Sequence, residues 1–167
     1  MSALAATLGP VVPSDVAGRV FARIHARGAG EHPDLVGVRG LSRRGEELLA
    51  GWRSGRLEVV SRRRSAVDGF VKYLLRLPDG KVAEAVRIPL PAGPTVTPAK
   101  HIVCVSSQVG CPFACAFCAT GRLGFGRNLA AWEMVDQVAR IRDEASAPVR
   151  GVVFMGQGEP FANYDAV

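Results

Sequence analysis

The sequence predicts an α/β fold, because the spacing of its apolar residues changes along the chain. Apolar residues recur at helical spacing in the first 56 residues and alternate at the two-residue period of strands over residues 57–88. From residue 101 onward the order is strand, loop, helix, strand and loop, which is typical of a parallel sheet. We therefore expect a basic helical accessory domain at 1–56, a β-hairpin and linker at 57–98, and the start of an α/β core at 99–167.

Two short helices are expected in the first of these regions. The segment SDVAGRVFARIHAR, residues 14–27, begins with a Ser/Asp cap and places four apolar residues on one helical face: Val16, Val20, Phe21 and Ile24. The segment GAGEHPD interrupts that helix. The segment LSRRGEELLAGW then predicts a second helix that is capped at Ser42.

Positive charge accumulates before the hairpin. The chain has a formal net charge of +6 and a sequence pI of about 9.7, and its only lysines are Lys72, Lys81 and Lys100. Arginine is dense between Arg39 and Arg64. Because guanidinium groups bind phosphate in bidentate fashion and stack on bases, this stretch is compatible with a nucleic-acid surface. A solvated basic face in a protein from a GC-rich genome explains it equally well.

The next region is expected to form a β-hairpin. The runs FVKYLLRL and KVAEAVRIP flank the turn signal PDG. In the second run, alternation places Glu84 on a face with Val82, Val86 and Ile88, and places Ala83, Ala85 and Arg87 on the other face. A carboxylate on an apolar face requires a partner or has a raised pKa. The alternative is that the alanine face is buried and Glu84 is solvated.

The remaining elements follow a proline-rich linker, PLPAGPTVTPAK. We expect a strand in HIVCVSS, a Gly- and Cys-rich loop at 106–127, and a helix capped at Asn128. A buried strand in VRGVVFMG then leads into QGEP. The helix carries polar residues at helical spacing on one face: Glu133, Asp136, Gln137, Arg140 and Glu144.

Three of the four cysteines indicate a metal centre. Cys111, Cys115 and Cys118 lie on the Gly-rich loop in a C-x3-C-x2-C pattern. A structural zinc site normally combines two ligand pairs, and no His or second Cys pair follows this triplet. Three thiolates on one loop suit a [4Fe–4S] cluster with one open iron, as in radical S-adenosylmethionine (SAM) enzymes. A zinc site remains the alternative for the triplet. The fourth cysteine, Cys104, lies in the expected strand before the loop, where an inert buried thiol is one interpretation.

The motifs together resemble a known family. The segments CVSSQVGCPFACAFCATGRLGFGRNL and FMGQGEPFANYDAV are similar to the RlmN/Cfr family of radical SAM methyltransferases of ribosomal RNA. VDGFVKYLLRLPDGKVAEAVRIP resembles the family's hairpin, and LVGVRGLSRRGEELL resembles its N-terminal helical module. The resemblance implies that residues 99–167 form the first two βα units of a partial (β/α)6 radical SAM barrel. The family's GMGEP is GQGEP here.

The resemblance also implies roles for individual residues. Cys111, Cys115 and Cys118 match the cluster ligands, and Gly158 and Glu159 match the loop that binds SAM. Glu84 matches a proton acceptor, and Cys104 matches the cysteine that resolves the enzyme–RNA adduct. In this family, a methyl group carried on a C-terminal cysteine is activated by a SAM-derived radical and added to C2 or C8 of an rRNA adenosine.

Several further expectations follow from this resemblance. The substrate is large-subunit rRNA, with tRNA as a second substrate in some members, and the electron donor is a protein such as flavodoxin. No signal peptide or membrane span is recognisable, so a cytoplasmic location is expected. The sequence ends at Val167, after two expected barrel strands and without the methyl-accepting cysteine, so we expect a fragment that is inactive alone. The alternatives are a radical SAM enzyme acting on a protein or metabolite, and a non-catalytic iron–sulfur or RNA-binding module.

Overall fold

The computed structural model describes residues 12–25, 35–50, 55–94 and 98–167. The chain divides into two compact units, Met1–Arg56 and Leu57–Val167. The predicted helix break at GAGEHPD lies outside the described residues. None of the helices in the described part of the chain is long and apolar enough to cross a membrane.

The first unit contains helices α2 (Ser14–Ile24) and α3 (Arg43–Leu49). The predicted apolar face of α2 is confirmed for Val16, Val20 and Ile24, which are buried with residues of α3 and its approach. The predicted Ser/Asp cap is wrong, because Pro13 occupies the N-cap position and no side chain caps the helix. The cap of α3 is as predicted, since the Ser42 hydroxyl accepts a hydrogen bond from the Gly45 backbone N–H at 3.1 Å.

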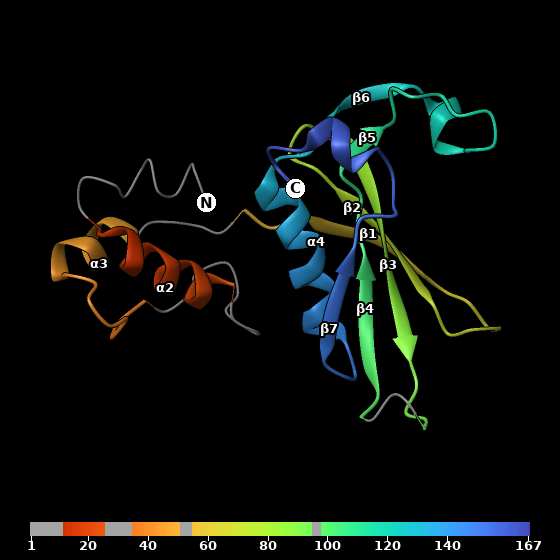
Figure 1. The fold of residues 1–167 in the computed structure, drawn as a ribbon. Helices are drawn as coiled ribbons and strands as arrows, with labels where there is room; N and C mark the ends of the chain where they lie inside the picture. The colour runs from red at the N-terminus through yellow and green to blue at the C-terminus, as the bar shows by residue number, and fades with distance from the viewer. Residues whose placement is uncertain (1–11, 26–34, 51–54, 95–97) are drawn as a thin grey trace. The chain divides into compact units, whose positions relative to one another are not determined.

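The second unit is built on one five-stranded sheet in the order β1-β2-β3-β4-β7 (Figure 1). The first three strands are antiparallel: β1 (Glu58–Arg64), β2 (Val71–Arg76) and β3 (Val82–Leu90). Strand β4 (Lys100–Cys104) joins β3 antiparallel, and β7 (Val149–Val153) joins β4 in parallel. The hairpin expected at 57–98 therefore shares its sheet with the strands of the region expected at 99–167.

Helix α4 (Ala131–Glu144) lies against one face of this sheet, beside β4 and β7 in Figure 1. The main core lies on that face and contains Tyr73, Leu75, Ala83, Ala85 and Val103 together with Met134 and Ile141 of the helix. Because strand side chains alternate, Glu84 must point to the opposite face. The prediction that Glu84 shares the buried apolar face is wrong, and the alternative, with a buried alanine face, is correct.

One expectation about α4 is corrected. Asn128 is not its cap: Asn128 ends strand β6 (Phe125–Asn128), and Ala130 is the N-cap residue. The helix also turns part of its polar face inward, because Glu133, Asp136 and Gln137 are buried. Each accepts a hydrogen bond from backbone N–H groups, at Ala130, Leu57 and Ser106 respectively. Polar groups can be buried at low cost when they are hydrogen-bonded in this way.

Candidate functional site

The candidate residues gather where the two parallel strands end. Strands β4 and β7 run in the same direction, so their carboxyl ends meet at one end of the sheet (Figure 1). The short ribbon of β5 (Gln108–Gly110) and β6 follows β4, and the loop with GQGEP follows β7. Ligands of open parallel sheets bind beyond the carboxyl ends of the strands.

Hydrogen bonds hold the loop after β7 against the chain that follows β4. The Gln157 backbone oxygen accepts from the N–H groups of Ser107 and Gln108 at 2.9 and 3.2 Å. The Gln157 N–H donates to the Ser106 hydroxyl at 2.9 Å, and that hydroxyl donates to the Glu84 backbone oxygen at 2.5 Å. A single buried serine therefore connects β3, the end of β4 and the GQGEP loop.

Gly158 is required by this close approach. Its φ of 100° lies in the region that favours glycine, and an added Cβ would lie 2.6 Å from the Cβ of Gln108. The next residue, Glu159, donates its backbone N–H to Gln108 Oε1 at 2.9 Å. Its carboxylate accepts from the Phe161 N–H at 3.0 Å and so caps the short 3-10 helix η2 (Pro160–Asn163). The structure thus places Gly158 and Glu159 in one ordered turn beside β5.

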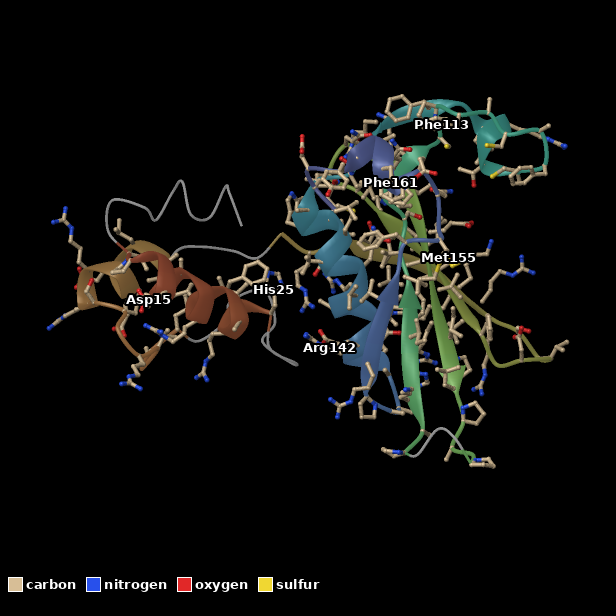
Figure 2. All side chains as sticks on the ribbon, viewed as in Figure 1. Asp15, His25, Phe113, Arg142, Met155 and Phe161 are labelled. Carbon is tan, nitrogen blue, oxygen red and sulfur yellow. The ribbon has the colours of Figure 1, made fainter. Side chains whose placement is uncertain are left out.

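The three cysteines of the triplet lie on the loop between β5 and β6, which also carries the labelled Phe113 in Figure 2. Cys111 and Cys118 are half-buried and Cys115 is exposed. The loop is stabilised by backbone hydrogen bonds from Cys111 to Gly124 and from Cys118 to Cys115, at 3.0 and 2.9 Å. Within the described ranges, no group of three or more Cys, His, Asp or Glu side chains is arranged to hold a metal ion.

The donor chemistry of this loop nevertheless fits an iron–sulfur cluster. Three thiols within eight residues are the ligands that such clusters use. Backbone hydrogen bonds from Gly121 and Thr120 lower the pKa of the Cys118 thiol, which favours the thiolate that binds metal. Cluster ligands commonly assemble only when the metal binds, because binding and local folding are coupled.

A cleft of about 540 Å³ opens on the sheet face opposite α4. It is lined by five segments that are separate in the sequence. Strand β1 and the turn after it contribute Arg63, Arg64, Ser65 and Phe70, and β2 contributes Lys72. The other lining residues are Glu84, Ala85, Val86 and Cys104 of the sheet, Thr120 of the cysteine loop, and Met155, Gly156 and Gln157 after β7.

Glu84 lies in this cleft and is paired. The Lys72 ammonium donates to both carboxylate oxygens of Glu84, at 3.1 and 3.3 Å. Both side chains remain partly open to solvent, with exposed fractions of 52% for Lys72 and 38% for Glu84. The carboxylate therefore has a cationic partner and is also accessible from the cleft.

Cys104 lies in the same cleft, one strand away. Cys104 pairs across the sheet with Val86, and Val86 lies two residues after Glu84 on β3. Burial raises the pKa of its thiol, while a backbone hydrogen bond with Met155 acts in the opposite direction. The Cys104 thiol is therefore favoured in its neutral form, in contrast to that of Cys118. A neutral thiol can still lose its proton to a base that enters the cleft.

The structure adds residues that the sequence did not indicate. Ser106 and Gln108 organise the site through the hydrogen bonds described above, and both are fully buried. The side-chain oxygen of Gln157 is buried and accepts no hydrogen bond from any described residue. A buried acceptor without a partner beside the cleft suits an ammonium or hydroxyl group of a bound cofactor. Polar residues directly after an apolar strand were the available signal in the sequence.

Comparisons with known proteins agree on one group of enzymes. A probable RNA methyltransferase of Myxococcus xanthus (strain DK1622) is 52% identical over 163 residues, which cover 96% of this chain and 44% of the relative. The probable dual-specificity RNA methyltransferase RlmN of Trichodesmium erythraeum is 42% identical over 145 residues, which cover 87% of this chain and 39% of the relative. No protein-family model matches the chain.

A solved structure extends the likeness to three dimensions. The crystal structure of a radical SAM methyltransferase from Sphaerobacter thermophilus superposes with a TM-score of 0.70 and 34% sequence identity. The match covers 95% of this chain and 45% of that one. The chain is thus homologous to RlmN-type radical SAM RNA methyltransferases over most of its length, and it spans under half the length of those proteins.

Proposed function

We propose that this chain supplies the cluster loop and part of the substrate cleft of a radical SAM enzyme that methylates an adenosine of large-subunit rRNA at C2 or C8. A tRNA is a second substrate on this proposal. One observation supports it above the others. A single cleft holds Glu84 and Cys104 and is bordered by the cysteine loop and by the loop after β7. The homologous RNA methyltransferases give the substrate class.

Under this proposal, Cys111, Cys115 and Cys118 hold a [4Fe–4S] cluster, and the turn at Gly158 and Glu159 receives SAM. When bound, the cluster and SAM supply the radical that makes a ring carbon reactive. The segment is suited to an ammonium group because it carries the Glu159 carboxylate and the buried Gln157 oxygen, which has no partner among the described residues. Strands β4 and β7 with α4 then correspond to the first units of the family's barrel.

Glu84 and Cys104 act on the RNA in this proposal. Glu84 accepts a proton from the methylated adenosine, and its pairing with Lys72 keeps the carboxylate oriented toward the cleft. Cys104 resolves the adduct between enzyme and RNA: its sulfur bonds to the sulfur of the methyl-carrying cysteine, the bond from that sulfur to the RNA-bound carbon breaks, and the electron pair of that bond and a proton go to the RNA-bound carbon. A flavodoxin-like protein supplies electrons, and the location is cytoplasmic.

The cluster is tested by anaerobic reconstitution of the 167-residue chain with iron and sulfide. We expect about one cluster per chain and broad absorption near ~400 nm, because three thiolates are available on one loop. Replacing Cys111, Cys115 or Cys118 by Ala should abolish that absorption. Cys104→Ala is the matched control and should retain it. Binding of zinc in place of iron would contradict the proposal.

The roles of Glu84 and Cys104 are tested in a full-length relative with the equivalent substitutions. Glu84→Gln and Cys104→Ala should leave cluster absorption and SAM cleavage intact, since neither residue is proposed to hold a cofactor. Both should lose release of methyladenosine, measured by mass spectrometry of the RNA. Loss of the cluster in either variant would instead indicate a structural role.

A further inference from the structure

The three consecutive arginines Arg62, Arg63 and Arg64 have different surroundings. Arg62 forms an ion pair with Glu144 at the end of α4 and lies over the Tyr73 ring. Arg63 and Arg64 line the cleft, and neither guanidinium group has a hydrogen-bond or ion-pair partner among the described residues. Because guanidinium groups pair readily with anions, two unpaired ones at a cleft indicate an anionic ligand.

Strand register links these arginines to the proposed chemistry. Arg63 pairs across the sheet with Lys72, Lys72 with Val86, and Val86 with Cys104. Directly paired residues share a face, so these four side chains form one row on the open face of the sheet. Neighbouring strands lie about 4.8 Å apart, so the row spans about 14 Å. The Arg63 end of the row therefore lies close enough to Cys104 for one RNA strand to reach both within a few nucleotides.

An aromatic ring completes this end of the cleft. Phe70 lies directly after the β1–β2 turn and lines the cleft beside Arg64. The turn is ordered by its own hydrogen bonds: Ser65 donates its backbone N–H to the Phe70 oxygen at 2.8 Å, and Asp68 accepts from the Phe70 N–H at 3.1 Å. Gly69, with a φ of 71°, allows the reversal. Phe70 is thus held in place before any ligand binds.

We propose that Arg63, Arg64 and Phe70 form an RNA-binding surface at the β1–β2 end of the cleft. Arg63 and Arg64 bind backbone phosphates, and Phe70 stacks on one base, so that a neighbouring nucleotide enters the cleft toward Cys104. The combination of cations with an aromatic platform is the usual means of binding single-stranded RNA, and it favours RNA over an acidic protein partner. This inference rests on the proposed function for its substrate class.

Binding of a fluorescein-labelled RNA stem-loop with an adenosine-containing single-stranded loop tests the surface. Fluorescence anisotropy is measured for the 167-residue chain between about 50 and 200 mM KCl. For the double variant Arg63→Gln/Arg64→Gln we expect weaker binding and a slope of log K against log salt that is shallower by about 1.4, since each phosphate contact to a single strand contributes about 0.7. Phe70→Leu should weaken binding about fivefold or more with an unchanged slope.

Arg76→Gln is the matched control. Arg76 lies on the same sheet face as Lys72, is paired with Glu58 at 2.9 Å, and does not line the cleft. It should keep both affinity and slope. Equal losses in the control and the double variant, or no loss in the double variant, would overturn the proposal. Arg63→Lys, which keeps the charge, should retain the slope and separates charge loss from misfolding.

Two further measurements distinguish the sources of failure. Titration with a flavodoxin tests the acidic-protein alternative: weaker flavodoxin binding by the double variant, with unchanged RNA binding, would overturn the RNA assignment. Cluster absorption is recorded without RNA. Absence of cluster absorption with intact RNA binding counts against the proposed function and supports this surface. A normal cluster with RNA binding that is insensitive to Arg63, Arg64 and Phe70 overturns the surface alone.

Discussion

The two faces of the five-stranded sheet differ in what covers them. The face with Tyr73, Leu75, Ala83 and Ala85 is buried beneath α4, where apolar packing dominates. The opposite face carries Lys72, Glu84 and Cys104 in a cleft that is open to solvent. Adjacent residues of one strand therefore have separate tasks. Because strand side chains alternate with a period of two, residues that stabilise the fold and residues of the proposed chemistry lie on opposite faces of the same strands.

The arginines also differ in role: some connect elements of the fold through ion pairs, whereas Arg63 and Arg64 line the cleft. Arg127 of β6 donates to both oxygens of Glu133 at 2.7 and 2.8 Å, and to Asp79 of the hairpin turn at 2.8 Å. These contacts raise the pKa of Arg127 and lower that of Asp79. They connect the end of the cysteine-loop ribbon to the start of α4 and to the β2–β3 turn. Arg127 thus stabilises the fold by connecting separate elements, as Arg62 does through its ion pair with Glu144.

The largest expected effect comes from neighbouring leucines of β2. Leu75 is fully buried in the core, whereas Leu74 is half-buried on the face with Glu84. Leu75→Ala should lower the free energy of unfolding by about 3 kcal/mol, because it leaves a cavity. Leu74→Ala should lower it by about 1 kcal/mol or less, because the site is already partly open to solvent. Urea denaturation measures both, and equal losses would contradict the distinction between the two faces.

The second effect concerns Arg127. Arg127→Gln would leave the Glu133 carboxylate, whose side chain is 3% exposed, without its cationic partner. We expect a loss of about 2 kcal/mol in unfolding free energy, below the usual range for a fully buried pair because Arg127 is itself partly exposed. Arg76→Gln, which breaks an exposed pair with Glu58, should cost less than about 0.5 kcal/mol. An unchanged unfolding free energy for Arg127→Gln in urea denaturation would show that Arg127 does not stabilise the fold.

A smaller effect is expected on the open face. Glu84→Gln breaks the pair with Lys72, but both side chains are partly solvated. The free energy of unfolding should change by less than about 0.5 kcal/mol, since exposed ion pairs contribute little. Thermal and urea midpoints should match those of the unsubstituted chain. A loss comparable to that of Leu75→Ala would assign Glu84 to the core and weaken its proposed role.

The smallest effect separates two thiols. Hydrogen bonds lower the pKa of Cys118 and burial raises that of Cys104, so Cys118 ionises at the lower pH. Iodoacetamide labelling of the metal-free chain, followed by peptide mass spectrometry across roughly pH 6 to 10, should modify Cys118 before Cys104 as pH rises. Cys104 should require higher pH. If Cys104 were labelled at a lower pH than Cys118, its thiol would ionise more readily than burial allows, and the prediction would be wrong.

Much of the local structure could be predicted. The hairpin around PDG, the Ser42 cap and the apolar face of the first helix are all present. The cysteine spacing and the GQGEP turn indicate a radical SAM enzyme, and the longer segments around them resemble the RlmN-type methyltransferases to which the chain is homologous. Both are local patterns, and physical constraints within a few residues determine them. The expected caps at Ser14/Asp15 and Asn128 are wrong, because the N-cap residues are Pro13 and Ala130, neither of which has a side chain that can accept a hydrogen bond.

Sequence patterns predicted α2, α3, α4, the hairpin strands β2 and β3, the parallel strands β4 and β7, and the ligand chemistry of the cysteine loop. They did not predict β1, or the β5–β6 ribbon within the expected loop at 106–127. Tertiary packing set which of the two alternating faces is buried, because Ala83 and Glu84 fit a strand equally well until α4 covers one side. It also decided that Glu133, Asp136 and Gln137 face inward, since their partners lie on other elements of the fold. The cleft that joins Arg63, Glu84, Cys104 and Met155 required strand pairing between segments far apart in the chain, which no local pattern records.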